Sequence, residues 1–165
     1  MASGSRRFEM NYSKAQKEIF NALLRGDRVG GFQCDDDNFF VTVGGCFGYI
    51  FPVRTIQFNT QKIAIMKPID INSLVNPENE LKLTLEFRAE RSFSRRMYRI
   101  LKADGKRVYV NDKFLSCFQN PRFYQERANN IGPIIVSENA NPKRENIPVG
   151  IVLPVRINDP EWENE

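Results

Sequence analysis

A chain of 165 residues is long enough for one packed domain, or for two closely packed halves, around a single core. It contains no histidine, which excludes Ser-His-Asp and Cys-His catalysis and histidine-ligated zinc but leaves carboxylate chemistry open. Its three cysteines form no Cys-x-x-Cys pair, which argues against a disulfide framework and a thiolate zinc site. No stretch has the length of a membrane-spanning helix and no signal-peptide apolar region follows the first residues. We therefore expect a cytoplasmic protein without membrane contact and without a cofactor.

The chain divides into a lead-in, one domain and a tail. Residues 1–9 are small and basic and precede a second methionine at position 10, so we interpret them as the remnant of an expression tag. Residues 10–157 are expected to form a single α+β domain. Residues 158–165 are acidic and are expected to form a disordered tail. The single tryptophan, Trp162, lies in this tail and is either a short docking motif for another protein or simply part of a chain end.

An internal repeat is the clearest organising feature of the chain. The segments 48–54 (Gly-Tyr-Ile-Phe-Pro-Val-Arg) and 150–156 (Gly-Ile-Val-Leu-Pro-Val-Arg) have the same pattern of a glycine, an apolar run and Pro-Val-Arg. Because proline removes a donor from a strand ladder, we expect both copies at a sheet edge, a strand end or a bulge. The repeat predicts an α+β fold with a mostly antiparallel sheet, two short helices and pseudo-duplicated helix-hairpin halves.

The first half predicts one helix and a hairpin. The helix begins after Ser13, which we expect to cap it together with Gln16, and it ends at Gly26. Its expected buried residues are Ala15, Ile19, Phe20, Ala22, Leu23 and Leu24. Strands over 38–43 and 46–53 flank a Gly44-Gly45 turn, and Gly30-Gly31 is also interpreted as a turn. We further expect a strand over 62–67, a helical turn over 70–75 and a loop over 76–79.

The second half predicts a long strand, a hairpin, a helix and two more strands. Alternating apolar and polar residues over 81–88 indicate a half-exposed strand, and Asp104-Gly105 joins strands at 97–102 and 107–110. Asn111-Asp112 is expected to cap a helix over 113–118. The remaining expectations are an irregular loop at 122–131, a buried strand at 133–136, an exposed loop at 138–148 and a final strand at 149–157.

Two segments of the second half carry a family resemblance. A strand enters a short helix through Tyr-Val-Asn-Asp-Lys-Phe-Leu at 109–115, and residues 151–156 end in Leu-Pro-Val-Arg. Both resemble the closing segment of a bacterial DNA sliding clamp (beta clamp) domain, here of a phage or mobile-element type. The resemblance implies a pseudo-two-fold domain with helices inside and sheets outside, acting in DNA replication. A clamp subunit has three such domains and this chain has room for one, so a ring would require several copies, and homo-oligomerisation stays open.

A basic cluster supplies the candidate site. Between Arg88 and Arg107 there are eight basic and two acidic residues, although the net charge of the whole chain is only +4. Lysine and arginine neutralise phosphates, and aromatic rings between them can stack on bases. A solvated strand face that keeps an edge soluble is the alternative. The expected nucleic-acid contacts are Arg88, Arg91, Arg95, Arg96, Arg99, Lys102, Lys106 and Arg107, with Phe93 and Tyr98 as stacking residues.

These features predict a non-enzymatic binding protein associated with DNA or with a replication or DNA-processing complex. One alternative is a phage-encoded anti-defence inhibitor of the anti-CRISPR type, which binds a nucleic-acid effector protein. Another is a metal-dependent carboxylate enzyme that uses Asp35, Asp36 or Glu86. The three aspartates at 35–37 also fit a turn before the strand at 38, since aspartate bonds its own backbone there, and we expect the turn and no metal site.

Overall fold

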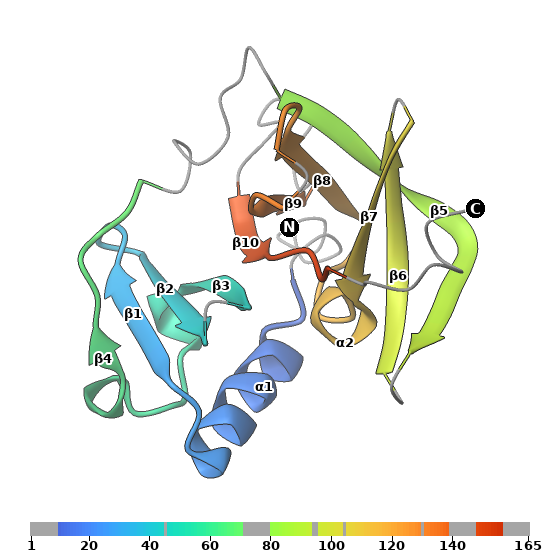
Figure 1. Ribbon diagram of the computed structural model, residues 1–165. Helices are drawn as coiled ribbons and strands as arrows, with labels where there is room; N and C mark the ends of the chain where they lie inside the picture. Colours follow the sequence, from blue (N-terminus) through green and yellow to red (C-terminus); the bar gives the residue numbers. More distant parts are fainter. Residues whose placement is uncertain are drawn as a thin grey trace, which may run out of the picture.

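The structure is a computed structural model that describes residues 10–44, 46–70, 80–93, 96–103, 105–129, 131–138 and 148–156, with only the backbone described for residues 80, 81 and 85–93. The described strands form one ten-stranded sheet in the order β4-β1-β2-β3-β10-β9-β8-β5-β6-β7. Every adjacent pair is antiparallel except β1 and β4, which are parallel. Two helices lie on the concave side of this sheet (Figure 1). The predicted α+β class with a mostly antiparallel sheet is confirmed.

The helices are α1 (Tyr12–Arg25) and α2 (Asp112–Leu115). The strands are β1 (Val29–Gln33), β2 (Asn38–Val43), β3 (Phe47–Pro52), β4 (Ala64–Ile65), β5 (Glu80–Phe93), β6 (Arg96–Ala103), β7 (Lys106–Asn111), β8 (Pro121–Glu126), β9 (Ile134–Glu138) and β10 (Pro148–Val152). Two single 3-10 turns, η2 (Val53–Thr55) and η3 (Thr60–Lys62), lie between β3 and β4.

Helix α1 starts two residues earlier than expected. The Asn11 side chain accepts a hydrogen bond from the Lys14 backbone N–H at 3.0 Å, so Asn11 and not Ser13 is the N-cap. Gln16, which was expected to complete a capping box, instead donates to the Thr55 carbonyl and accepts from the backbone N–H of Gln57. The helix ends as predicted at Gly26, whose φ of 78° is the left-handed conformation that glycine adopts at low cost.

The buried stripe of α1 is narrower than predicted. Ala15, Ile19 and Ala22 are fully buried, as expected. Phe20 and Leu24 are 55% and 71% exposed, which contradicts their assignment to the core. Both lie on the flank of the helix, and helical spacing alone does not tell how wide a face the neighbouring sheet covers.

The two repeat segments lie side by side in the middle of the sheet. Strand β3 pairs with β10 in antiparallel register, with Gly150 opposite Tyr49 and Ile151 opposite Gly48. Of the three places expected for the prolines, the strand end is the one observed and the sheet edge is excluded, because β2 and β9 flank this pair. Pro52 is the last residue of β3 and is followed by a 3-10 turn, and Pro154 comes two residues after Val152, the last residue of β10.

Each half contains one strand more than the sequence predicted. The order α1-β1-β2-β3 in the first half matches α2-β8-β9-β10 in the second. Strand β1 includes Gly30 and Gly31, so their interpretation as a turn is wrong. A Cβ on Gly31 would lie 2.5 Å from the carbonyl oxygen of Phe40, which makes glycine necessary at this position. Strand β8 occupies part of the expected irregular loop at 122–131, with Phe123 and Gln125 buried.

The boundaries of the remaining helices and strands agree in part with those predicted from the sequence. The hairpins β2-β3 and β6-β7, the strand β9 and the Asn111 cap of α2 are as predicted. Helix α2 is shorter than the expected 113–118, β4 is shorter than 62–67, and β10 ends before 157. The expected helical turn and loop at 70–79, apart from residue 70, and most of the loop at 138–148 lie outside the described residues, as do the lead-in and the tail.

One core joins both helices to the sheet. The main cluster contains Ala15, Ile19 and Ala22 of α1, Leu115 of α2 and apolar residues from strands in both halves, including Tyr49, Leu83, Leu101, Val110, Ile134 and Val152. We call this side of the sheet the helix face and the opposite side the outer face. A smaller cluster of Phe32, Phe40 and Ile135 lies apart from the main core. Their places in the strand pairing put these residues on the outer face.

Candidate nucleic-acid interface

The predicted basic cluster lies on three neighbouring strands, β5, β6 and β7. Gly105, with a φ of 75°, provides the tight turn of the β6-β7 hairpin. Residues paired across strands share a face. Leu101 opposite Val108 belongs to the main core, so the next pair, Lys102 opposite Arg107, must lie on the outer face.

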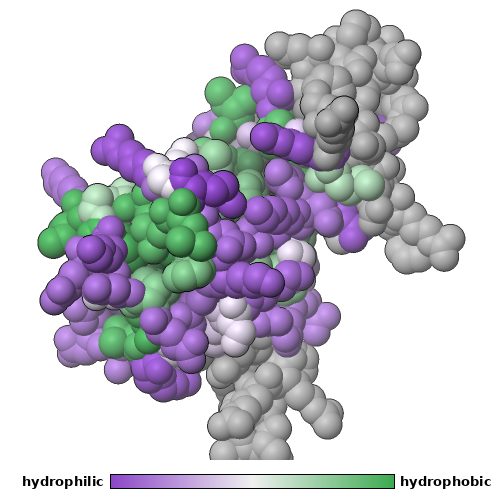
Figure 2. Space-filling view, turned by 90° about the horizontal axis from the view of Figure 1, so that it is seen from below, coloured by the Kyte–Doolittle hydropathy of each residue, from purple (hydrophilic) through white to green (hydrophobic). Residues whose placement is uncertain are grey.

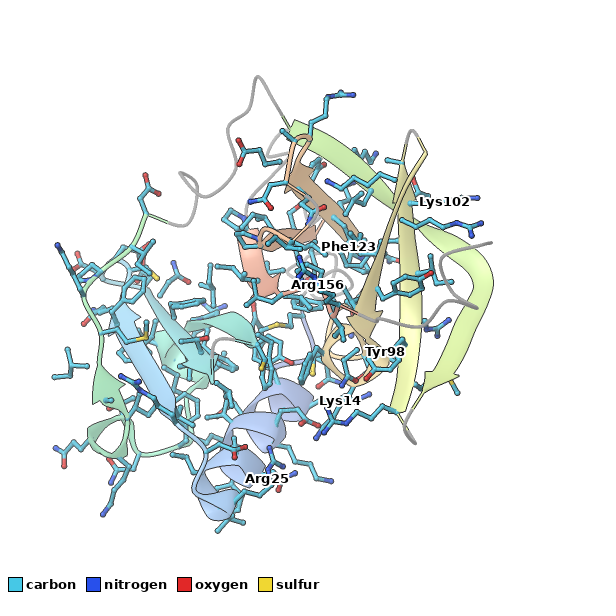
Figure 3. All side chains as sticks on the ribbon, viewed as in Figure 1. Lys14, Arg25, Tyr98, Lys102, Phe123 and Arg156 are labelled. Atoms are coloured by element: carbon cyan, nitrogen blue, oxygen red, sulfur yellow. The ribbon has the colours of Figure 1, made fainter. Side chains whose placement is uncertain are left out.

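Three cations converge on this outer face. Arg107 lies opposite Lys102, Lys102 lies opposite Thr84, and Lys82 is two residues before Thr84 on the same strand face. All three strands are neighbours, so the Cβ atoms of directly paired residues are about 5 Å apart. We call Lys82, Lys102 and Arg107 the outer cation group. Figure 3 shows Lys102 on the opposite side of the β6-β7 ribbon from Phe123, which belongs to the main core.

Two side chains that were predicted to contact phosphate, Arg99 and Lys106, form bonds within the fold. The Nε of Arg99 lies 2.7 Å from Oδ1 of Asp112 at the start of α2, and this ion pair is partly buried. The Nζ of Lys106 donates to the carbonyl oxygens of Glu126 and Asn129 at 3.1 and 3.3 Å. Partial burial lowers the pKa of the Lys106 amine. Arg99 and Lys106 are thus engaged within the fold, and a phosphate would compete with these bonds, so their assignment as phosphate contacts stays a prediction.

The predicted stacking role of Tyr98 is wrong. Tyr98 is 5% exposed, so a base cannot stack on its ring. Ile100, two residues further along the strand, is 3% exposed. Both lie on the outer face, two and four residues before Lys102, and neither belongs to the two core clusters. Arg96 is exposed at the start of the same strand. The side chains of Arg88, Arg91, Phe93 and Arg95 lie outside the described part of the chain, so their predicted contacts remain predictions.

Lys82 was missed by the sequence analysis although a signal for it was present. The alternation that predicted strand β5 puts Lys82 and Thr84 on the face opposite Leu83, which is 2% exposed. The basic cluster was delimited by its density along the chain, and Lys82 falls before it. Only the pairing of β5 with β6 brings Lys82 close to Lys102.

The side of the molecule on which α1 lies differs from the ribbon in how its charged side chains are paired. Figure 2, seen from the side on which α1 lies in Figure 1, is mostly hydrophilic, with hydrophobic residues gathered toward the left, where β1 and β4 lie. Two lysines or arginines there are held in ion pairs: Arg25 with Asp27 at 2.9 Å, and Lys113 with Glu18 at 3.0 Å. This side therefore offers fewer uncommitted cations than its lysine and arginine content suggests.

The aspartates at 35–37 form the predicted turn. The Asp35 carboxylate accepts hydrogen bonds from the backbone N–H of Asp37 at 2.8 Å and from the Asn38 side-chain amide at 3.1 Å. The bond from Asn38 first, and that from Asp37 second, lower the pKa of Asp35. Among the described residues no group of three or more carboxylate, cysteine or histidine side chains is arranged to hold a metal ion. The Glu86 side chain lies outside the description.

Comparison with known proteins gives no further information. No protein-family model, no curated protein and no solved structure matches this chain. Within the described residues, no helix is both long enough and apolar enough to cross a bilayer. The class of the protein is therefore defined by the fold itself: an α+β domain in which two helix-plus-three-strand units join through their last strands.

Proposed function

We propose that this chain is a non-enzymatic, cytoplasmic protein that binds the nucleic-acid backbone through its outer cation group. The observation that carries the proposal is the direct pairing of Lys102 with Arg107, next to Lys82. Like charges directly opposite each other destabilise an antiparallel pair. Lys102 and Lys82 form no ion pair with another described residue. The negative charge of a polyanionic partner offsets this repulsion. Binding also gains entropy, because each neutralised phosphate releases counterions.

The contacts favour backbone over base recognition. Tyr98 is buried and Tyr109 is partly buried, so the described ribbon offers exposed cations but no fully exposed aromatic ring. Lysine and arginine contacts to phosphate position a protein on nucleic acid without reading its sequence. The expected binding is thus sequence-independent and strongly dependent on salt.

The clamp-like assignment belongs to the same proposal. The matching order of a helix and three strands in each half, with β3 and β10 paired at the centre, supports an internally duplicated domain. A clamp-like domain of this kind would act in DNA replication or in a DNA-processing complex, and several copies would be needed to encircle DNA. Sedimentation of the chain with and without duplex DNA tests whether copies associate.

The binding proposal is tested by titrating a labelled DNA duplex at several salt concentrations. Three phosphate contacts predict that log affinity falls with log salt with a slope of about −2.7, from about −0.9 per contact. Lys102→Gln and Arg107→Gln should each weaken binding and reduce the slope by about one. Arg99→Gln is the matched control, because it removes an arginine of the same strand that is paired with Asp112. Unchanged affinity of the Lys102→Glu/Arg107→Glu double variant would exclude the proposal.

A protein partner is the second candidate function, and one observation favours it. The outer face has a mostly apolar groove of about 1160 Å³ beside β1, β3 and β10, lined by Gly30, Phe40, Gly48, Ile151 and Leu153 and by Ile65, which is 95% exposed. Exposed apolar surface of this kind marks protein contacts. An inhibitor of a nucleic-acid effector would use this groove. Its binding to the effector should survive Lys102→Glu and be lost in Ile65→Glu.

A further inference from the structure

The two faces of the strands β4, β1, β2, β3 and β10 are covered differently by the part of the chain that the structure describes. Helices α1 and α2 both contribute to the main cluster on the helix face. The outer face of the same strands carries the mostly apolar groove of about 1160 Å³, which we call the outer groove. An antiparallel sheet that is packed on one side presents its other side to solvent or to a partner.

The floor of the outer groove is flat and apolar because two glycines receive large side chains. Gly30 and Gly48 lie in one row across the sheet, each opposite Thr42. A Cβ on Gly48 would lie 2.6 Å from the ring of Phe40, and a Cβ on Gly30 would lie 2.7 Å from the sulfur of Met66. Both large side chains therefore lie along the sheet and do not stand up from it. The Thr42 hydroxyl donates to a backbone carbonyl of β3 at 2.8 Å, so it needs no bond from a ligand.

Exposed apolar side chains flank this floor on two sides. Leu153, which is 37% exposed, comes after β10, and Ile69, which is 42% exposed, comes after β4. Strands β4 and β10 are four positions apart in the sheet, which is about 19 Å at about 4.8 Å per strand. A helix with its side chains is about 10–12 Å across, whereas a single strand of about 5 Å would leave most of the floor wet. The dimensions therefore fit a helix that lies along the strands.

The charge of the outer groove has one sign. Among the described residues that line it, the only charged side chains are Arg28 and Lys67. Both are exposed, and neither forms an ion pair with another described residue. Arg25, three residues before Arg28, is by contrast bound to Asp27. Two uncommitted cations beside an apolar floor are complementary to a partner that is apolar and acidic.

The two cations lie toward opposite ends of the outer groove. In the parallel pair of β1 and β4, Gly30 lies opposite Ala64. Arg28 is two residues before Gly30, and Lys67 is three residues after Ala64, so at strand spacing they are about 17 Å apart along the sheet. The same length is about 11 residues, or about three turns, of a helix. Residues three full turns apart share a face of a helix, so one helix face can present a carboxylate to each cation.

We propose that the outer groove binds an amphipathic helix of a partner protein, with an apolar stripe on the floor and an acidic residue near each of Arg28 and Lys67. The proposal names the chemistry of the partner in the second candidate function and rests on that function. Burial of the stripe supplies affinity, because apolar area on both surfaces leaves water. The two carboxylates fix the position of the helix along the strands.

The first test selects the occupant from a library of displayed random peptides of about 16 residues, which is about four helical turns. Selected peptides should carry apolar residues at helical spacing and acidic residues about 11 positions apart. Selection on the Arg28→Glu/Lys67→Glu chain should replace those acidic residues by basic ones. No enrichment, or enrichment of peptides without acidic residues, would overturn the proposal.

The second test measures the affinity of one selected, labelled peptide by fluorescence anisotropy. Leu153→Glu and Ile69→Glu should each weaken binding at least about ten-fold, because each adds a carboxylate to an apolar contact. Leu24→Glu is the matched control, since Leu24 is 71% exposed on α1 and does not line the groove, and it should leave the affinity unchanged. Equal losses in Leu24→Glu and Leu153→Glu would contradict the proposed place of binding. Circular dichroism should show that the bound peptide gains helix, and a bound peptide without helix would exclude the helical occupant.

Two other occupants would give results of their own. A second copy of the chain would sediment as a dimer that Leu153→Glu dissociates. A lipid surface would carry the chain upward in flotation with vesicles of phosphatidylserine and phosphatidylcholine, and Leu153→Glu would abolish this flotation. Either result would overturn the assignment of the outer groove to a partner helix.

The outer groove and the outer cation group can be tested separately. Lys102→Glu/Arg107→Glu should weaken duplex binding and leave peptide binding unchanged, and Leu153→Glu should do the reverse. If the peptide binds and no duplex does, the nucleic-acid proposal is wrong and the helix-binding groove stands. If the peptide binds but no nucleic-acid effector is inhibited, only the inhibitor function is excluded. If the duplex binds through Lys102 and no acidic peptide binds, the helix-binding groove alone is wrong.

Discussion

The two faces of the sheet differ in what they require of the sequence. The helix face is filled by one continuous cluster in which Tyr49, Phe51, Leu101, Ile134 and Val152 have no exposed surface. The outer face has a small apolar cluster and an open groove at one end and a group of cations at the other. Burial of the helix face drives folding, since it removes most apolar area from water. The composition of the outer face is not needed for that, so its features are better guides to binding.

Aromatic contacts show how closely the helix face is packed. The ring of Tyr49 lies 5.3 Å from Phe47, 6.0 Å from Phe51 and 5.6 Å from Phe118, measured between centroids. Its hydroxyl donates to the Cys117 sulfur at 3.5 Å, which satisfies a polar group in an apolar site. In the edge strand β4, by contrast, Ile65 has almost no neighbours to exclude water.

Two isoleucines provide the sharpest comparison of the buried core with the open groove. Ile134→Ala should lower the free energy of unfolding by about 2–5 kcal/mol, because Ile134 is fully buried and its removal leaves a cavity. Ile65→Ala should change it by less than about 0.5 kcal/mol, because Ile65 is 95% exposed. Urea unfolding of both variants measures the difference. Similar losses in the two variants would show that the outer groove is part of the folding core.

Substitution of Gly150 tests how closely β3 and β10 must approach each other. A Cβ on Gly150 would lie 2.7 Å from the Phe118 ring and 2.8 Å from the carbonyl oxygen of Gly48. Gly150→Ala should therefore cost about 1–3 kcal/mol of stability through overpacking. Gly44→Ala serves as the control, because a Cβ there meets nothing within 4 Å and only its φ of 56° opposes the change. Thermal unfolding should rank Gly150→Ala as the more damaging variant, and the reverse order would argue against close packing at the repeat.

Alkaline pH should lower the free energy of unfolding through two buried groups of the helix face, Tyr49 and Cys117. Burial, and to a lesser degree the neighbouring Cys117, raises the pKa of Tyr49 far above its ordinary value of 10.0. Above about pH 10 the unfolded chain therefore loses a proton that the folded chain keeps, and the free energy of unfolding falls by up to about 1.4 kcal/mol per pH unit. Burial also raises the pKa of the Cys117 thiol, which adds a loss in the same direction above its ordinary value of 9.0. Urea unfolding between about pH 8 and 11 should show a shallower decline for Tyr49→Phe; the same slope in both chains would contradict the assignment.

The smallest effect is expected at the ion pair on the ribbon. The Arg99 and Asp112 side chains are 29% and 37% exposed, so solvent screens their attraction. Arg99→Gln should lower stability by about 0.2–1 kcal/mol and leave duplex binding unchanged. Lys102→Gln should have the opposite profile, with unchanged stability and weaker binding. A loss of binding in Arg99→Gln would move the interface toward α2.

Local patterns were sufficient for many elements of the fold. Apolar alternation identified β5, the Asp-Gly signal identified the β6-β7 hairpin, and Gly26 identified the end of α1. Each is decided by backbone conformation or by period within a few residues. Strands β1 and β8 were not predicted, because their own sequences are poor strand signals: β1 carries two glycines, and β8 buries Gln125. Neighbouring strands supply what those sequences lack.

The candidate site was only partly visible in the sequence. Density of charge along the chain identified Lys102 and Arg107, but it also included Arg99 and Lys106, which bond within the fold, and Tyr98, which is buried. It left out Lys82, which reaches the group only through the pairing of β5 with β6. Which face a strand residue occupies follows from alternation, but which face is covered depends on elements distant in the chain.

The sequence by itself determined the class of the fold, its duplicated halves and the ribbon that carries the cations, because periodicity, turn residues and caps act over short distances. Only the tertiary structure decided that the two repeat segments pair at the centre of the sheet and that the chain after β10 is anchored at β7 beside Arg107. Those arrangements depend on contacts between residues far apart in the chain, and the free energy that selects them comes from filling one shared core on the helix face.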